Sequence, residues 1–361
     1  MADKSAFAIA VLAGDGIGPE VMAPCLEILN LAARKTGGFS LELEHLPAGA
    51  GAYVESGTAL PEETMARARA ADAILLGAMG LPDIRYADGT EITPQLDLRF
   101  RLGLYAGVRP IRAIPGLRPV LADPRQAAID LVILRESTEG LFASHGKGVV
   151  TDQEACETLV ITRAVSERLF RFAFDLARSR KATGAPGRVT CVDKASIFKA
   201  YAFFRQVFDE IAAKHSDIEA AHRYVDATAL DLVSRPWELD VLVMENMFGD
   251  ILSDLAAGLI GGMGFAPSAD IGENDAVFQP SHGSAPDIAG QGKANPTAMV
   301  LSAAMMLEWL GARHGNAAAT EAGRRIRNAV DAAFADGSLL PFELGGDAGT
   351  EAIADAVVKA L

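Results

Sequence analysis

The sequence has little cysteine, and this scarcity argues against two kinds of protein. Its 361 residues include three cysteines, Cys25, Cys156 and Cys191, which are far apart and odd in number. A disulfide framework is therefore not expected, and we expect reduced, mostly buried thiols instead. The sequence also has no Cys-x-x-Cys pair, which argues against a zinc site built from cysteines.

Basic residues and long apolar runs are scarce as well. Lysine and arginine number 33 against 47 aspartates and glutamates, which gives a formal net charge of -14. Such a field repels polyphosphate, so nucleic acid is not an expected partner. The apolar run at 298–307 is far shorter than the ~18–20 residues of a membrane span. The run at 6–13 is more typical of a first strand than of a signal peptide. We therefore expect a cytoplasmic protein without membrane contact.

Apolar runs and helical patterns alternate along the chain. Strands are predicted at 7–12, 41–46 and 73–76, with helices after Pro19 and from Pro61. Later segments are predicted as strands at 131–134, 188–192 and 239–244, helices at 161–178, 197–213, 302–310 and 318–335, and a protruding hairpin within 142–155. This order predicts an α/β protein with parallel strands, and the length is enough for two domains.

The acidic segment around Asp250 and Asp254 is a candidate metal site. Residues four apart share one face of a helix, where two carboxylates repel each other unless a cation lies between them. Carboxylates without a nearby His or Cys favour Mg²⁺ or Mn²⁺ over zinc. The alternative is a helix-capping Asp250 followed by a solvated Asp254. The apolar neighbours Ile251, Leu252 and Leu255 favour a place beside a buried surface.

Several basic residues stand where ligand contacts are expected. Arg135 ends the strand at 131–134, and Arg99 and Arg109 come from separate segments. Three converging guanidinium groups would hold an acid with several carboxylates, although any one arginine taken alone is more typical of a surface ion pair. Lys194 follows the strand at 188–192, and in a cleft it could act as a general base; the alternative is an exposed lysine.

Two glycine-rich segments lead to different conclusions. Gly14, Gly16 and Gly18 resemble a dinucleotide fingerprint, but Pro19 occupies the place of its third glycine, so a Rossmann fold is rejected. The loop at 282–290 could bring its backbone close to a cofactor, and Asp287 could accept both hydroxyls of an adenosine ribose.

Taken together, these motifs resemble the β-decarboxylating dehydrogenases, which include isopropylmalate, isocitrate, homoisocitrate and tartrate/D-malate dehydrogenases. The resemblance runs almost end to end. It is carried, in the order of the family, by residues 14–20, the spacing of Arg99 and Arg109-Pro110, and residues 135–140, 193–195, 224–227, 246–254 and 282–295.

The resemblance implies a two-domain α/β fold with a long mixed sheet, of the isopropylmalate/isocitrate dehydrogenase type and not a Rossmann fold. Residues 1–104 plus 256–361 would form the cofactor-binding domain, and residues 105–255 the central substrate and dimerisation domain. It also implies a homodimer whose active sites take residues from both subunits.

The resemblance further implies a role for each motif. Arg99, Arg109 and Arg135 would bind the carboxylates of a small-molecule 2-hydroxy acid. Asp250 and Asp254 would bind Mg²⁺ or Mn²⁺ together with Asp226 of the second subunit, and Lys194 of that subunit would be the base. The cofactor would be NAD, because Asp287 would repel the 2′-phosphate of NADP. The implied cofactor-binding residues are His282, Gly283, Ser284, Ala285, Pro286, Asp287, Ile288 and Asn295.

Two positions depart from the family pattern. Phe142 stands where a tyrosine usually helps to protonate the enol, so either water, Ser144 or His145 supplies that proton, or the reaction ends at oxidation. Thr93, Gln95 and Leu96 stand where isopropylmalate enzymes carry two leucines and isocitrate enzymes carry Ser and Asn. Gln95 is a poor floor for a branched alkyl group and a better partner for a hydroxyl.

The predicted function is NAD-dependent oxidation, with decarboxylation, of a metal-chelated 2-hydroxy acid similar to 3-isopropylmalate, tartrate or malate. One alternative is an oxidation-only dehydrogenase of a sugar-acid-like substrate. Another is a non-catalytic regulatory subunit of the same family, which is disfavoured because the metal, base and arginine positions are all retained.

Overall fold

The computed structural model describes residues 4–361. Ten strands form one sheet, and two short strands form a separate hairpin. The sheet strands are β1 (Ala6–Gly14), β2 (Ser40–His45), β3 (Ala73–Ala78), β4 (Ala106–Arg112), β5 (Asp130–Glu136), β8 (Arg188–Asp193), β9 (Glu219–Tyr224), β10 (Val241–Met244), β11 (Pro267–Ile271) and β12 (Ala276–Pro280), and the hairpin is β6 (Val149–Val150) and β7 (Ala155–Cys156).

Eleven α-helices are present in the described part of the chain. They are α1 (Gly18–Thr36), α2 (Ala50–Ser56), α3 (Glu62–Ala70), α4 (Pro94–Leu102), α5 (Arg163–Lys181), α6 (Lys199–Ala212), α7 (Val225–Ser234), α8 (Asn246–Leu259), α9 (Thr297–His314), α10 (Ala317–Phe334) and α11 (Thr350–Ala360). Within residues 4–361 no helix combines the length and apolarity that a membrane crossing requires.

The sheet is mixed, as expected for the predicted fold class. Its strand order is β2-β1-β3-β12-β11-β4-β5-β10-β8-β9. The first four strands are parallel to one another, and so are the last four. Three antiparallel pairings, β12 with β11, β11 with β4, and β4 with β5, join these two sets. The predicted α/β fold with a long mixed sheet is therefore confirmed.

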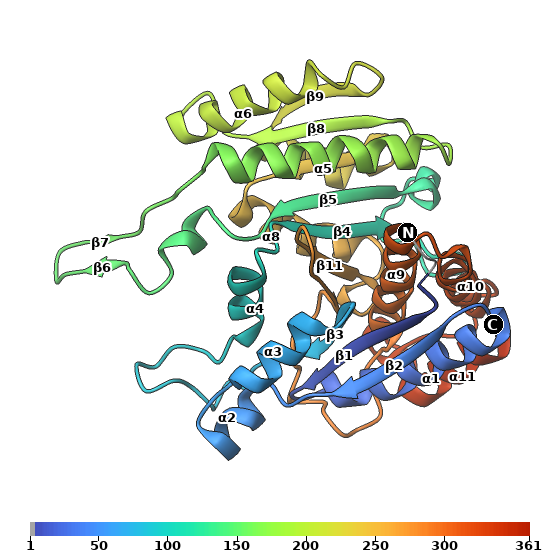
Figure 1. The fold of residues 1–361 in the computed structure, drawn as a ribbon. Coiled ribbons are helices and arrows are strands. Elements are labelled where there is room, and N and C mark those ends of the chain that lie inside the picture. Colours follow the sequence, from blue (N-terminus) through green and yellow to red (C-terminus); the bar gives the residue numbers. More distant parts are fainter. Residues whose placement is uncertain (1–3) are drawn as a thin grey trace.

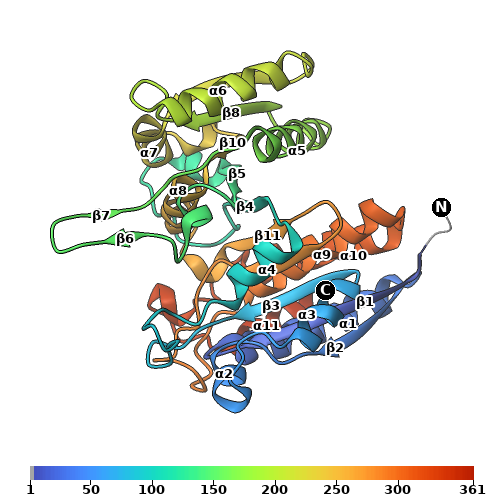
Figure 2. The ribbon, with the colours of Figure 1, turned by 60° about the vertical axis from the view of Figure 1, so that its left-hand side comes forward.

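Helices cover both faces of this sheet, and Figures 1 and 2 show α5 and α8 on opposite sides of β5. Helix α5 packs on β5, β8 and β10, whereas α9 packs on β3, β11 and β12. The main apolar core contains residues from both parallel sets of strands. Because the sheet and this core run continuously through the molecule, the proposed division at residues 104 and 255 stays a prediction.

The strands and helices that the sequence predicts are present, but several elements were not predicted: β4, β9, β11, β12, α2, α4, α7 and α11. Among these, α2 lies in the segment between β2 and the helix predicted from Pro61. Buried Asp15 explains this helix, because its carboxylate accepts hydrogen bonds from the N–H groups of Ala50 (2.7 Å) and Gly51 (2.8 Å). These groups have no partner within the helix. A cap that comes from 35 residues away in the chain gives no local signal.

The hairpin predicted within 142–155 is present as β6 and β7, which pair Val149 with Cys156 and project from the body of the molecule (Figure 2). All three cysteines are free thiols. Cys25 and Cys191 are buried, while Cys156 is exposed on the hairpin.

Candidate active site

A cavity of about 320 Å³ lies beside the middle of the sheet, and we call it the front cavity. Its lining includes ten of the residues that the sequence singled out as site residues: Thr93, Gln95, Arg99, Arg109, Arg135, Phe142, Asp250, Asp254, His282 and Gly283. Residues more than 150 positions apart in the chain therefore meet in one place. Lys194 and Asp226 do not line this cavity.

The three arginines reach the cavity from three different elements. Arg99 stands in the last turn of α4, Arg109 within β4 and Arg135 at the end of β5, and all three are buried. Burial lowers the pKa of Arg109. Burial is also the larger cause of the lowered pKa of Arg135, and repulsion from Arg99 is the next; together they bring this pKa to about 10. Closely spaced buried cations of this kind are costly unless anions neutralise them.

One neutralising anion is Asp270 on β11, which sequence analysis missed. Its carboxylate accepts hydrogen bonds from Arg99 Nε at 3.1 Å, from Gln279 Nε2 at 2.8 Å and from Ser137 Oγ at 3.2 Å. Burial raises the pKa of Asp270, but the attraction of the three arginines outweighs burial and lowers the pKa overall. The available signal was a lone acid in the apolar strand Pro267–Ile271.

Gly107 on β4 makes room for this arrangement. A Cβ atom at Gly107 would lie 2.6 Å from Ser137 Oγ and 3.2 Å from Asp270 Oδ1. A side chain there would therefore push Asp270 and Ser137 apart. Because residue 107 is glycine, the buried carboxylate of Asp270 can lie within hydrogen-bonding distance of Arg99.

Asp250 and Asp254 face the cavity from α8. Glu245 caps this helix by accepting hydrogen bonds from the N–H groups of Met247 and Phe248, so the alternative reading of Asp250 as the cap is wrong. Gly249 lets α8 approach β5, because its Cβ would lie 2.5 Å from Arg135 Cβ. Asp250 consequently forms an ion pair with Arg135.

The two carboxylates suit a divalent cation. Burial raises the pKa of Asp254, and repulsion from Asp250 raises it further; a cation between the two groups would relieve that repulsion. Residues 4–361 contain no cluster of three or more His, Cys, Asp or Glu that could hold a metal. A third carboxylate would have to come from outside this cavity.

Asp226 and Lys194 form a separate pair. Asp226 lies in the first turn of α7, and Lys194 Nζ donates to Asp226 Oδ2 at 2.8 Å. The hydrogen bond from Lys194 lowers the pKa of the Asp226 carboxyl. Both side chains are partly or largely exposed, so a second copy of the chain could reach them.

The sequence predicts that the apolar neighbours of Asp250 and Asp254 lie beside a buried surface, and this expectation is only partly met. Leu252 is buried, but Ile251 is 61% exposed and Leu255 38% exposed, so in a single chain the surface beside Asp250 and Asp254 is not fully covered. Leu230 and Val233 on the neighbouring α7 are exposed as well. Exposed apolar side chains on adjacent helices are typical of a protein–protein interface.

The loop between β12 and α9 carries the predicted cofactor residues. His282 and Gly283 line the front cavity, and Asp287 is exposed on the loop. The side chains of two other predicted cofactor-binding residues are hydrogen-bonded within the protein. Ser284 Oγ donates to Gly80 O at 2.5 Å, and Asn295 Nδ2 donates to Glu343 Oε1 at 2.5 Å. A cofactor would therefore meet the backbone near Ser284 and Asn295 rather than these polar atoms.

The first turn of the chain holds this loop in place. Ile17 N donates to Ser284 O at 2.8 Å, and a Cβ on Gly16 would lie 2.0 Å from the same oxygen. Glu20 accepts hydrogen bonds from the N–H groups of Gly290 and Ala294. The glycine-rich turn at 14–18 therefore supports the loop at 282–290 by close packing.

Phe142 lies on the front cavity with its ring under a guanidinium group, and Arg135 Cζ is 5.3 Å from the ring centroid. Of the two substitutes for the missing hydroxyl, Ser144 is buried, and its Oγ donates to the carbonyl oxygens of Leu141 and Thr158. His145 is exposed and lines an adjoining space of about 630 Å³ together with Phe142. His145 is the better placed of the two.

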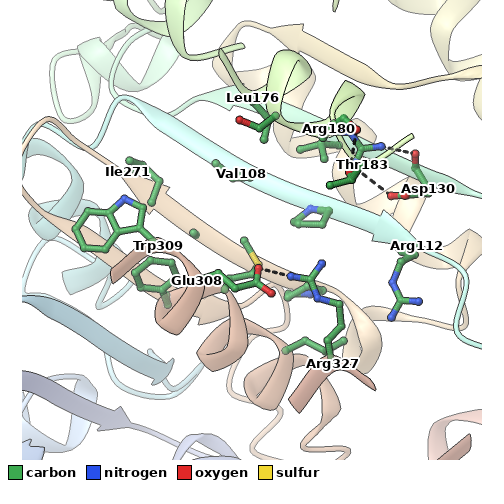
Figure 3. A pocket seen from close by; sticks show the side chains of 18 of the residues that line it. Val108, Arg112, Asp130, Leu176, Arg180, Thr183, Ile271, Glu308, Trp309 and Arg327 are labelled. Carbon is green, nitrogen blue, oxygen red and sulfur yellow. Dashed lines mark hydrogen bonds and ion pairs between the residues drawn. The ribbon is translucent and has the colours of Figure 1, made fainter. Parts of the chain in front are cut away.

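A larger cavity of about 420 Å³ lies on the opposite face of the sheet (Figure 3). Alternate strand residues, Val108 on β4 and Val132 on β5, point into it, whereas Arg109 and Arg135 point to the front. The charged side chains at its rim are already paired, as Arg180 is with Asp130. This back cavity contains none of the predicted site residues.

Residues 8–357 match the protein family described as isocitrate/isopropylmalate dehydrogenase. The chain belongs to the isocitrate/isopropylmalate dehydrogenase family. It is 41% identical to the 3-isopropylmalate/3-methylmalate dehydrogenase of Methanocaldococcus jannaschii, over 97% of this chain and 98% of the relative. It is also 41% identical to the homoisocitrate dehydrogenase of the same organism, over 97% of this chain and 96% of the relative.

Comparison with solved structures supports this family assignment. The isocitrate dehydrogenase from Methylococcus capsulatus has a TM-score of 0.84 at 38% identity, with 98% of this chain and 99% of that chain covered. A β-decarboxylating dehydrogenase from Thermococcus kodakarensis has a TM-score of 0.79 at 35% identity, with 98% and 96% covered. Membership makes the chain an oxidoreductase and supports the oxidative decarboxylation of a hydroxy acid. Because relatives with different named substrates are about equally similar, family membership leaves the substrate open.

Proposed function

We propose that this chain oxidises a 2-hydroxy dicarboxylic or polycarboxylic acid with NAD and Mg²⁺ or Mn²⁺, and that the product is then decarboxylated. The observation that carries the proposal is the meeting of Arg99, Arg109 and Arg135 with Asp250 and Asp254 in the front cavity. Guanidinium groups bind carboxylates, and paired carboxylates bind hard divalent cations.

The arginines are the proposed carboxylate-binding residues. Arg99 uses its Nε for Asp270 and Arg135 uses its Nε for Asn246, which fixes both side chains. Arg109 Nη1 donates to Ser281 Oγ, while its buried Nε has no hydrogen-bond partner within the described residues. Protein covers this Nε, so the proposed donor to a bound carboxylate oxygen is Nη2 of Arg109, which makes no hydrogen bond within the described residues.

We assign the metal to Asp250 and Asp254, completed by Asp226 of a second copy, because the front cavity offers no third carboxylate within residues 4–361. A bound divalent ion would make the substrate hydroxyl more acidic. Lys194 of that second copy is the proposed base that takes the hydroxyl proton. The exposed apolar residues of α7 and α8 support such a homodimer.

The loop at 282–295 is the proposed NAD site. NAD would accept the hydride from the substrate carbon. Asp287 supports NAD over NADP, because its exposed carboxylate can accept the ribose hydroxyls and would repel a phosphate. Burial lowers the pKa of His282, so this side chain enters the cavity uncharged and adds no positive charge beside a positively charged nicotinamide.

Phe142 favours a second candidate function, oxidation without loss of CO₂, since it brings no proton donor to the cavity. The test measures NADH and CO₂ together for purified protein with Mn²⁺ across 3-isopropylmalate, isocitrate, D-malate, tartrate and sugar acids. The proposal expects one CO₂ per NADH. NADH without CO₂ would establish the oxidation-only reaction, and no NADH with any acid would refute both functions.

A further inference from the structure

Helices from both ends of the chain meet the second half of the loop at 282–295. Helix α1, near the amino end, packs against α11 at the carboxyl end (Figure 1). Residues 290–295 lie beside this pair and form neither helix nor strand. A segment without regular structure keeps its conformational freedom unless other groups hold it, and it then loses that freedom when a ligand binds.

Glu20 on α1 and Thr350 on α11 hold this segment. The Glu20 carboxylate accepts hydrogen bonds from the N–H groups of Gly290 at 2.8 Å and of Ala294 at 3.2 Å. Thr350 is 7% exposed, and its Oγ1 lies 2.6 Å from Ala294 O and 2.9 Å from Glu20 Oε1. Its backbone N–H donates to Gly292 O at 2.9 Å. One buried hydroxyl therefore links the loop to the carboxylate that binds it.

The fit between α11 and the loop is close. A Cβ atom at Gly349 would collide with Gly292 O, so the glycine before Thr350 is needed for this approach. The Thr350 hydroxyl has one proton and two acceptors, and both acceptors lose a donor if the hydroxyl is removed. Neither Thr350 nor Glu20 lines the front cavity, so any effect that they have on a ligand there is indirect.

We infer that Thr350 and Glu20 are positioning residues for the dinucleotide, and that they hold residues 290–295 in the conformation that binds NAD. This inference rests on the proposed function, which assigns the loop at 282–295 to NAD. Asp287 and Asn295, two of the proposed NAD contacts, lie on either side of the held segment. Its position therefore sets the distance between them, whereas the metal and the acid bind elsewhere, in the front cavity.

The first test compares two variants of Thr350. Thr350→Val removes the hydroxyl and keeps the shape of the side chain, and Thr350→Ser keeps the hydroxyl. Titration of the purified full chain with NADH, without acid, measures Kd. Thr350→Val should raise Kd by about tenfold, the effect of losing a hydrogen bond that involves a charged group, and Thr350→Ser should restore the affinity. KM for NAD should rise with Kd, while kcat, KM for the acid and the affinity for Mn²⁺ stay unchanged.

Thr64→Val is the matched control for a loss of stability. Thr64 lies in the first turn of α3, is 2% exposed and donates its hydroxyl proton to Pro47 O at 2.9 Å. Both valine variants should lower the midpoint of thermal unfolding. Only Thr350→Val should weaken the binding of NADH, and only Thr350→Val should speed the hydrogen exchange of the amides in residues 282–295.

The variant Glu20→Gln tests the same contact from the other helix. An amide has one acceptor oxygen where the carboxylate has two, so at least one N–H of the loop loses its partner. Kd for NADH should rise by at least about tenfold. Because Glu20 and Thr350 act on the same segment, the double variant should weaken binding by less than the product of the two single effects.

The outcomes separate this inference from the proposed function. An unchanged Kd for NADH in Thr350→Val, or an equal loss in Thr64→Val, would overturn the inference and leave the function standing. Equal weakening of NADH and Mn²⁺ would overturn it too, because the hydroxyl would then support the fold as a whole. A wild-type chain that binds no NADH would overturn the assignment of the loop and, with it, the proposed function.

Discussion

The most specific prediction about the stability of the protein concerns Asp270, beside the front cavity. The substitution Asp270→Asn keeps the shape of the side chain but removes the charge that Arg99 Nε contacts at 3.1 Å. Asp270 is 1% exposed, and Arg99 and Arg109 are almost as deeply buried. Removing one partner of a buried ion pair costs about 3–5 kcal/mol, so the free energy of unfolding should fall by about that amount.

The pH dependence of this loss follows from the pKa of Asp270, which is lowered in the folded protein. A carboxyl group with a lowered pKa stabilises the fold above its unfolded pKa of ~3.9, and this stabilisation is lost as the pH falls through the folded value. The difference between wild type and Asp270→Asn should therefore be constant near neutral pH and should shrink below about pH 4.

Urea unfolding followed by fluorescence and circular dichroism measures this difference, provided that both signals change together. Asp331→Asn is the control, since its ion pair with Arg112 is partly exposed and should contribute about 1 kcal/mol or less. Malonate, an unreactive dicarboxylate, should stabilise Asp270→Asn more than wild type. A loss no larger than that of the control would refute the account of the arginine cluster.

Three further predictions concern the metal, the dimer and the loop. Mn²⁺ at 100 times its Kd should stabilise wild type by about 2.7 kcal/mol, and Asp254→Asn should abolish this gain in thermal unfolding. Lys194→Ala and Asp254→Asn should each be inactive, but mixed subunits should regain about a quarter of wild-type activity, because half the dimers would hold one intact site. His282→Gln should gain stability relative to wild type as the pH falls below about 6.5, since burial lowers the pKa of His282 and the unfolded chain then binds more protons than the folded one.

Each of these predictions has a result that would contradict it. Equal stabilisation of wild type and Asp254→Asn by Mn²⁺ would place the metal elsewhere. Mixed subunits that stay inactive after refolding together would contradict a site shared between two copies. A stability difference between wild type and His282→Gln that does not change with pH would mean that the imidazole is not held in its neutral form.

The sequence predicted the elements with strong local patterns. The β-α-β-α-β start, the helices α5, α6, α9 and α10 and the exposed hairpin all have periodicity or turn residues of their own. It also placed the residues of the front cavity, because the motif around Arg99, Arg135 and Asp250 resembles a family with a fixed order of motifs. Local pattern and family resemblance supported each other there.

What the sequence did not predict depends on contacts between distant segments. Helix α2 follows a loop-like sequence and needs the carboxylate of Asp15 at its start. Asp270 lies in a short apolar strand, and its role depends on Arg99, 171 residues away. The antiparallel pairing of β11 with both β12 and β4 has no periodic signal either, because β11 and β12 are buried along their whole length.

The most direct test of the central claim is NADH formation by the purified full chain with NAD and a 2-hydroxy dicarboxylic acid, measured with Mn²⁺ and again with excess chelator. The account predicts NADH formation that requires the metal and is lost in Asp254→Asn. NADH formation that persists without metal, or that survives in Asp254→Asn, would contradict the assignment of the front cavity as the active site.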